Sequence, residues 1–119
     1  MDENKRLVKA IVDGIQEKKG KNIKIVDLSE INDTITKYLV ISEGGSPTQV
    51  HAIHESIREF AIKEANQRPI STDGVRNSIW IAMDYVDVVA HVFLPEARNF
   101  YDIDNLWEDA PITEIPNLD

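Results

Sequence analysis

Two aspartates and a histidine stand in the otherwise apolar stretch DYVDVVAHVF, which begins at Asp84. Carboxylates and imidazole can form a metal or acid–base site, and they can equally mark a sheet edge or a surface that meets another protein. Asp84 and Asp87 are close enough to share a cation, but His91 lies about 13 Å from Asp87 along an extended strand. A further pair, Asp102 and Asp104, has no partner ligand that the sequence identifies. The spacing favours an interface or a half-buried sheet position over a catalytic or metal site.

A second candidate for chemistry is the sequence GGS, residues Gly44 to Ser46. Glycines before a helix can hold a phosphate, but this segment has neither the lysine of a P-loop nor the spacing of a dinucleotide fingerprint. A turn followed by a helix cap explains it more simply, so we expect no cofactor. The competing hypothesis is a small nucleotide-binding or nucleotidyl-transferring enzyme that uses Gly44, Gly45, Asp84 and Asp87.

Composition limits the class of protein. The 119 residues include 42% hydrophobic and 29% charged residues, which is typical of one folded domain. The chain has no cysteine, which excludes disulfides and thiolate chemistry. We recognise no signal peptide and no apolar run near the roughly 18 residues of a membrane span, so we expect a cytoplasmic protein that does not enter membranes.

The net charge of −8, from 21 acids against 13 bases, disfavours binding of DNA or another nucleic-acid backbone over the whole surface. It suits a basic partner protein, and it is equally what simple solubility requires.

Local patterns predict an α+β fold, a mixed β-sheet flanked by helices that lie mainly on one face. Apolar residues at helical spacing from Leu7 to Ile15 predict a first helix. In SPTQ, Ser46 can cap a second helix, Pro47 suits its first position, and Gln49 can complete a capping box. We expect a single domain over residues 1–110 and an acidic C-terminal tail over residues 111–119. The predicted strands are residues 22–28, 37–42, 78–84 and 87–94, and a short helix follows at 96–101.

The last two strands form a predicted hairpin with a tight turn at Tyr85 and Val86. A symmetric turn pairs Trp80 with His91 and places Asp84 opposite Asp87. One face of the hairpin is uniformly apolar and should pack on the helices; it carries Ile79, Ile81, Met83, Val88, Ala90, Val92 and Leu94. The other face mixes aromatic, acidic and imidazole groups, as interfaces do; it carries Trp80, Ala82, Asp84, Asp87, Val89, His91 and Phe93.

Three segments together resemble the ribosomal silencing factor family, also called Iojap-like. They are YLVISEGGSPTQVHAI, WIAMDYVDVVAHVF and RNFYDIDNLWEDAP, and the resemblance runs from about Leu7 to Pro111. It implies a fold related to nucleotidyltransferases without their catalytic carboxylates. It also implies binding to a large-subunit ribosomal protein at the subunit interface, which blocks joining of the small subunit when nutrients are scarce, and a homodimer off the ribosome.

From the hairpin and this resemblance we expect a non-enzymatic ribosome-binding regulator with Trp80 as its central aromatic anchor. A different hypothesis gives the tail and Trp107 the main role in a homodimer. The expected protein-interaction residues are Trp80, Asp84, Asp87, His91, Phe93, Arg98 and Tyr101.

Two positions depart from the family pattern. Val86 stands where the family usually has glycine, and because valine resists a positive φ we expect a wider turn. The segment SEGGS has two glycines where the family more often has one, which leaves open where the second helix begins.

Overall fold

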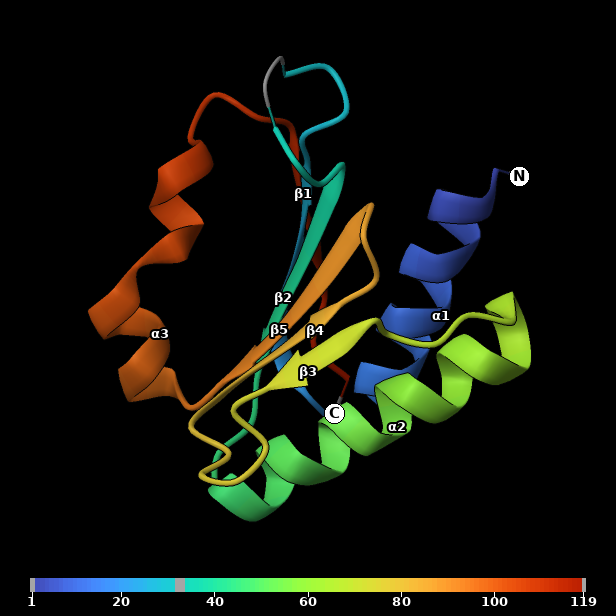
Figure 1. The fold of residues 1–119 in the computed structure, drawn as a ribbon. Coiled ribbons are helices and arrows are strands. Elements are labelled where there is room, and N and C mark those ends of the chain that lie inside the picture. The colour runs from blue at the N-terminus through green and yellow to red at the C-terminus, as the bar shows by residue number, and fades with distance from the viewer. Residues whose placement is uncertain (1, 32–33, 119) are drawn as a thin grey trace.

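Six strands form one mixed sheet in the order β3-β4-β5-β2-β1-β6 (Figure 1). The structure is a computed structural model that describes residues 2–31 and 34–118. β2 and β5 pair in parallel, whereas the other neighbours pair antiparallel. This confirms the α+β class with a mixed sheet, while the nucleotidyltransferase-like topology stays a prediction. The elements are α1 (Glu3–Glu17), β1 (Lys21–Asp27), β2 (Tyr38–Glu43), α2 (Pro47–Ala65), β3 (Ser71–Asp73), β4 (Trp80–Asp84), β5 (Val88–Phe93), α3 (Pro95–Tyr101), the 3-10 helix η1 (Ile103–Trp107) and β6 (Ile112–Ile115).

The start of α2 follows the sequence signal closely. The Ser46 hydroxyl accepts a hydrogen bond from the Gln49 backbone N–H at 3.1 Å, and Pro47 is the first helical residue. The predicted capping box is displaced by one residue, because the Gln49 side-chain oxygen accepts from the backbone N–H of Gly45 at 2.7 Å. The same amide donates to the Lys18 carbonyl at 3.1 Å, which ties the start of α2 to the end of α1.

α1 and α2 lie side by side on one face of the sheet (Figure 1). Gly14 allows the close approach, since a Cβ there would lie 2.9 Å from the Ile57 Cα. The Ser56 hydroxyl donates to the Gly14 carbonyl at 2.7 Å across the same contact. Removing this aliphatic surface from water supplies most of the stabilisation of this layer. Its buried residues include Leu7, Ile11, Ile15, Val50, Ile53, Ile57, Ile81, Met83, Val88, Ala90 and Val92.

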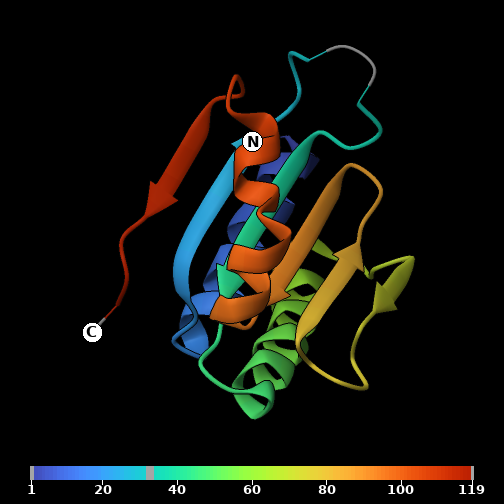
Figure 2. The same cartoon turned by 90° about the vertical axis from the view of Figure 1, so that its left-hand side faces the viewer.

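α3 and η1 lie on the opposite face of the sheet. Figure 2 shows α3 in front of β2, with β4 and β3 beyond it toward the sheet edge. A second, smaller cluster of buried residues forms beneath this cover and consists of Val26, Leu28, Leu39, Ile41, Phe93, Ala97 and Ala110.

The hairpin keeps its predicted faces but not its predicted register. Trp80 pairs with Phe93 and Asp84 pairs with Val89, so the predicted partners were two positions off. Because the shift is even, the residues of β4 and β5 themselves stay on their predicted faces. Two flanking residues do not: the Asp87 carboxylate contacts Asn4 on α1, and Ile79 is 46% exposed instead of packing on the helices. The expectation about Val86 was also wrong: it adopts φ 77°, and the Asp87 N–H donates to the Tyr85 carbonyl at 3.1 Å in a γ-turn.

The C-terminal segment differs from the predicted tail. Ile112–Ile115 forms β6, an antiparallel edge strand on β1. Pro111 and Pro116 flank it, and proline is tolerated at sheet edges because it has no backbone N–H to donate. The short β3 was likewise not among the predicted strands.

Within residues 2–31 and 34–118, no helix combines the length and apolar character that crossing a membrane requires.

Candidate functional site

An aromatic cluster forms where the β4–β5 hairpin meets α3. The Trp80 indole stacks on Phe93 with ring centroids 4.9 Å apart, and it lies 4.6 Å from the Tyr101 ring. Phe93 is fully buried and supports the indole from below, whereas Tyr101 is 50% exposed. Trp80 is half-buried between them. We call the surrounding surface the Trp80 face; it consists of Trp80, Ala82, Asp84, Val89, His91 and Tyr101.

His91 fixes the orientation of the indole. The Trp80 Nε1–H donates to His91 Nδ1 at 3.0 Å, along a diagonal between neighbouring cross-strand pairs. Burial lowers the pKa of His91 to about 4, so its imidazole is neutral near pH 7. A neutral ring with Nδ1 unprotonated is the form that can accept this bond. The predicted proximity of Trp80 and His91 is therefore confirmed, although the two are not cross-strand partners.

The two hairpin aspartates have separate structural partners. An Asp84 carboxylate oxygen accepts from the Val86 N–H at 2.7 Å and stabilises the turn. The Asp87 carboxylate accepts from the Asn4 side chain at 3.4 Å, and its carbonyl accepts from the Lys37 N–H. Among the described residues, no group of three or more His, Cys, Asp or Glu side chains could hold a metal ion. Both carboxylates are half-exposed at the hairpin end.

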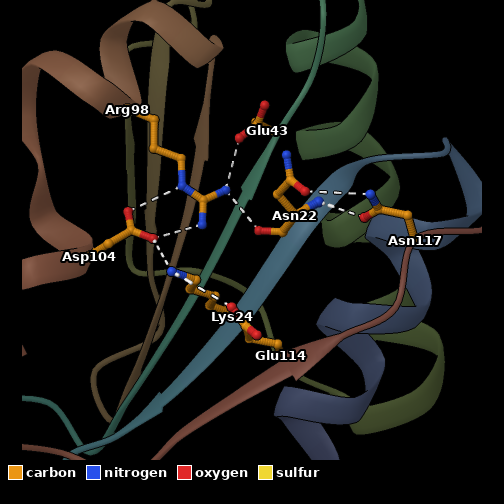
Figure 3. Close-up of polar contacts among 7 residues, drawn as sticks. All are labelled: Asn22, Lys24, Glu43, Arg98, Asp104, Glu114 and Asn117. Atoms are coloured by element: carbon orange, nitrogen blue, oxygen red, sulfur yellow. Dashed lines mark hydrogen bonds and ion pairs between the residues drawn. The ribbon is translucent and has the colours of Figure 1, made fainter. Parts of the chain in front are cut away.

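Arg98 does not join the Trp80 face. Its side chain is 8% exposed and points toward β1 and β2 (Figure 3). It forms a bidentate pair with Asp104, with Nη2 donating to Oδ2 at 2.8 Å and Nε to Oδ1 at 3.1 Å. Nη1 donates to Glu43 at 3.0 Å and to the Asn22 carbonyl at 2.7 Å. The residue that we expected to contact a partner is engaged inside the protein.

A β-bulge makes the Asn22 backbone available to this network. The register of β1 against β2 shifts between Lys21 and Lys24, and Asn22 adopts φ 52°. A bulge leaves its extra residue out of the strand ladder. The Asn22 carbonyl accepts a hydrogen bond from Arg98, and the Asn22 N–H donates to the Asn117 side chain at 2.8 Å (Figure 3). The bulge therefore joins α3 and the C-terminal segment to the same point of the sheet.

A cleft of about 750 Å³ opens beside these residues, between η1, β1 and β6. Sequence reasoning missed its polar network, including Lys24, whose Nζ lies 3.3 Å from the Asp104 carboxylate. Burial acts to raise the pKa of Asp104, but the hydrogen bonds and charges of Arg98 and Lys24 outweigh it and lower that pKa. The sequence did offer one signal. Asp104, the last residue of the segment DID, follows Arg98 by six residues, so its carboxylate could pair with a cation within the chain.

The competing nucleotide site is not assembled. The Gly44 N–H donates to the Phe93 carbonyl at the end of β5, whereas Asp84 and Asp87 flank the start of that strand. About 17 Å of extended strand separates the two ends. Gly45 already donates its N–H to Gln49. The two halves of that hypothesis cannot meet around one ligand.

Known proteins similar to this chain were identified from both sequence and structure. A sequence model of the family described as "Ribosomal silencing factor during starvation" matches residues 1–119. The ribosomal silencing factor RsfS of Chromobacterium violaceum is 31% identical over 105 residues, which cover 88% of this chain and 84% of that protein. A crystal structure of a protein from the same bacterium superposes with a TM-score of 0.81 at 31% identity, covering 90% of this chain and 87% of that one.

A more distant relative is the mouse protein named "Mitochondrial assembly of ribosomal large subunit protein 1". It is 30% identical over 74 residues, which cover 60% of this chain and 32% of the mouse protein.

Proposed function

This chain belongs to the ribosomal silencing factor family, and from that membership we propose that it binds the large ribosomal subunit and blocks joining of the small subunit. The direct partner is a basic ribosomal protein at the subunit interface. Binding lowers translation in the cytoplasm when nutrients are scarce. The protein acts by occupying a surface and catalyses no reaction.

The observation that carries this proposal is the braced aromatic cluster of the Trp80 face. A large aromatic side chain whose rotamer is already fixed loses little conformational entropy on binding. Trp80 is held by Phe93 below, Tyr101 beside it and the hydrogen bond to His91. Tryptophans in such positions often dominate interface energies.

Charge and relationship support the choice of partner. The net charge is −8, and Asp84 lies at one end of the Trp80 face, where it can meet Lys and Arg side chains. Asp87 lies at the same end of the hairpin, but its carboxylate contacts Asn4 on α1. Opposite charges speed encounter and disfavour wrong partners. The mouse relative is named for assembly of the large ribosomal subunit, which agrees with this choice. The family resemblance also implies a homodimer off the ribosome, which a mass measurement in solution tests.

Sedimentation with purified subunits tests the proposal. We expect the wild-type protein to pellet with large subunits and to lower the fraction of joined ribosomes in a sucrose gradient. Trp80→Ala should weaken binding by at least about 2 kcal/mol, roughly 30-fold. Phe60→Ala is the matched control, because Phe60 is a half-buried aromatic residue on α2, in the helical layer across the sheet. Absence of wild-type binding, or equal binding by Trp80→Ala, would contradict the proposal.

A further inference from the structure

α3 and η1 carry Tyr101 but have few apolar anchors of their own. α3 spans seven residues, and its buried residues are Ala97 and Arg98. In η1 the half-buried apolar residues are Ile103 and Trp107. Helices this short are unstable in isolation, so tertiary contacts must decide where the segment lies.

Arg98 supplies contacts that span four elements. From α3 it reaches Asp104 on η1, Glu43 on β2 and the Asn22 carbonyl on β1. Guanidinium–carboxylate bonds are short, strong and fixed in direction, and the planar fork of arginine sets the angle between its partners. Lys24 adds a second cation next to Asp104, so the largely buried carboxylates of Asp104 and Glu43 are paired with Arg98 and Lys24 (Figure 3). Lys24 also lies 3.9 Å from the exposed carboxylate of Glu114.

Arg98 and Tyr101 lie one helical turn apart on α3, so holding one constrains the position of the other. We propose that Arg98 is a positioning residue. Its hydrogen bonds tie α3 and η1 to the bulge of β1 and the end of β2, and we call this set of bonds the clasp. The clasp keeps Tyr101 against Trp80 and so preserves the shape of the Trp80 face. The clasp is a property of the free protein. Its consequence for the ribosome rests on the proposed function.

A direct contact between Arg98 and the partner is the competing role. Its side chain is 8% exposed, and its two ion pairs and the bond to Asn22 would have to break before it could reach outward. Breaking buried charged hydrogen bonds is costly. The geometry therefore favours positioning over contact.

Hydrogen exchange in the free protein tests the clasp without any ribosome. In Arg98→Met, we expect backbone amides of residues 95–107 to exchange about tenfold faster or more, with those of α1 and α2 changed less than about twofold. Arg98→Lys keeps the charge but loses the fork, and should give an intermediate rate. Arg76→Met controls for removing an exposed arginine. Unchanged exchange over residues 95–107 in Arg98→Met would overturn the proposal. If that variant does not fold, Arg98→Lys and Asp104→Asn decide by the same criterion.

A double-mutant cycle on binding to large subunits separates positioning from contact. Arg98→Met and Tyr101→Ala should each lower the affinity for large subunits. The affinity of the double variant should be no more than about twofold below that of the single variant that binds less tightly. If the fold-losses of affinity of the two single variants multiply in the double variant, Arg98 contacts the partner independently of Tyr101, and the positioning role would be overturned. Absence of binding by the wild type would instead contradict the proposed function, and the exchange experiment would still decide on the clasp.

Discussion

The two faces of the sheet are built by different means. On the face under α1 and α2, aliphatic side chains such as Ile11, Ile53 and Ile57 are fully buried, and Gly14 lets the helices touch. On the opposite face, a short helix and η1 cover β2 and β1, and polar contacts to Arg98 help to hold them. Trp80 lies at the border of that cover.

This difference assigns separate tasks to the two faces. Aliphatic packing contributes stability in proportion to the area removed from water and offers nothing distinctive to a partner. The Trp80 face leaves aromatic and acidic groups at the surface, as recognition requires. Substitutions on the two faces should therefore separate loss of stability from loss of affinity.

The largest expected effect is on stability. Ile57→Ala removes a fully buried side chain from the contact between α1 and α2. It should lower the free energy of unfolding by about 2–5 kcal/mol in urea denaturation. Affinity of the folded protein for large subunits should change less than about twofold. A loss of stability below about 1 kcal/mol, or a large loss of affinity, would contradict the division between the faces.

An acid-dependent loss of stability should follow from His91. The folded-state pKa of about 4 lies below the ordinary 6.5, so between these values the unfolded state binds more protons. The free energy of unfolding should fall as the pH drops from 6.5 to 4, by about 1–2 kcal/mol once partial exposure is allowed for. Urea denaturation of the wild type and His91→Gln at several pH values measures this difference. Identical pH dependence in both proteins would refute it.

A smaller effect should come from Tyr101, on affinity more than on stability. Its ring lies against Trp80 but is 50% exposed. Tyr101→Ala should weaken binding to large subunits by about 1 kcal/mol, roughly fivefold, as measured by sedimentation. Tyr101→Phe should stay close to the wild type, because it keeps the ring. If the phenylalanine variant is as weak as the alanine one, packing on Trp80 is not what Tyr101 contributes.

The smallest effect should come from the hairpin acids. Asp84→Asn combined with Asp87→Asn should weaken binding about two- to threefold and reduce its sensitivity to salt, since half-exposed charges are screened. Asparagine at position 84 keeps an oxygen that can accept the Val86 N–H. Glu59→Gln, an exposed acid on α2, is the matched control. Equal affinity and equal salt dependence in the double variant would exclude a role for these carboxylates.

Local chemistry made part of the fold predictable. The start of α2 was predictable because the residues that specify it, Ser46, Pro47 and Gln49, all lie within one helical turn of each other in the sequence. Alternation of side chains separated the two faces of β4 and β5 even though the register was wrong, because an even shift preserves the face. Asp87, in the turn between the strands, left its predicted face and contacts Asn4 on α1. The register itself depended on Val86 accepting a positive φ, against its own preference, with help from the Asp84 carboxylate.

Long-range contacts made the rest unpredictable. Arg98 looked like a surface residue because its partners lie on three other elements, and one of them is a backbone carbonyl exposed by a bulge. β6 was missed because its pairing depends on an edge of β1 distant in sequence. The sequence identified no partner for Asp102 and Asp104 for the same reason. Asp104 pairs with the cations of Lys24 and Arg98, which only the folded chain brings near it.

Side-chain footprinting with hydroxyl radicals, with and without purified large subunits, tests most directly whether the Trp80 face is the recognition surface. Binding should reduce the labelling of Trp80 and Tyr101 several-fold while leaving Phe60 and His51 on α2 unchanged. Protection of the α2 residues with continued labelling of Trp80 would place the interface on the other face of the sheet and contradict the division of tasks described above.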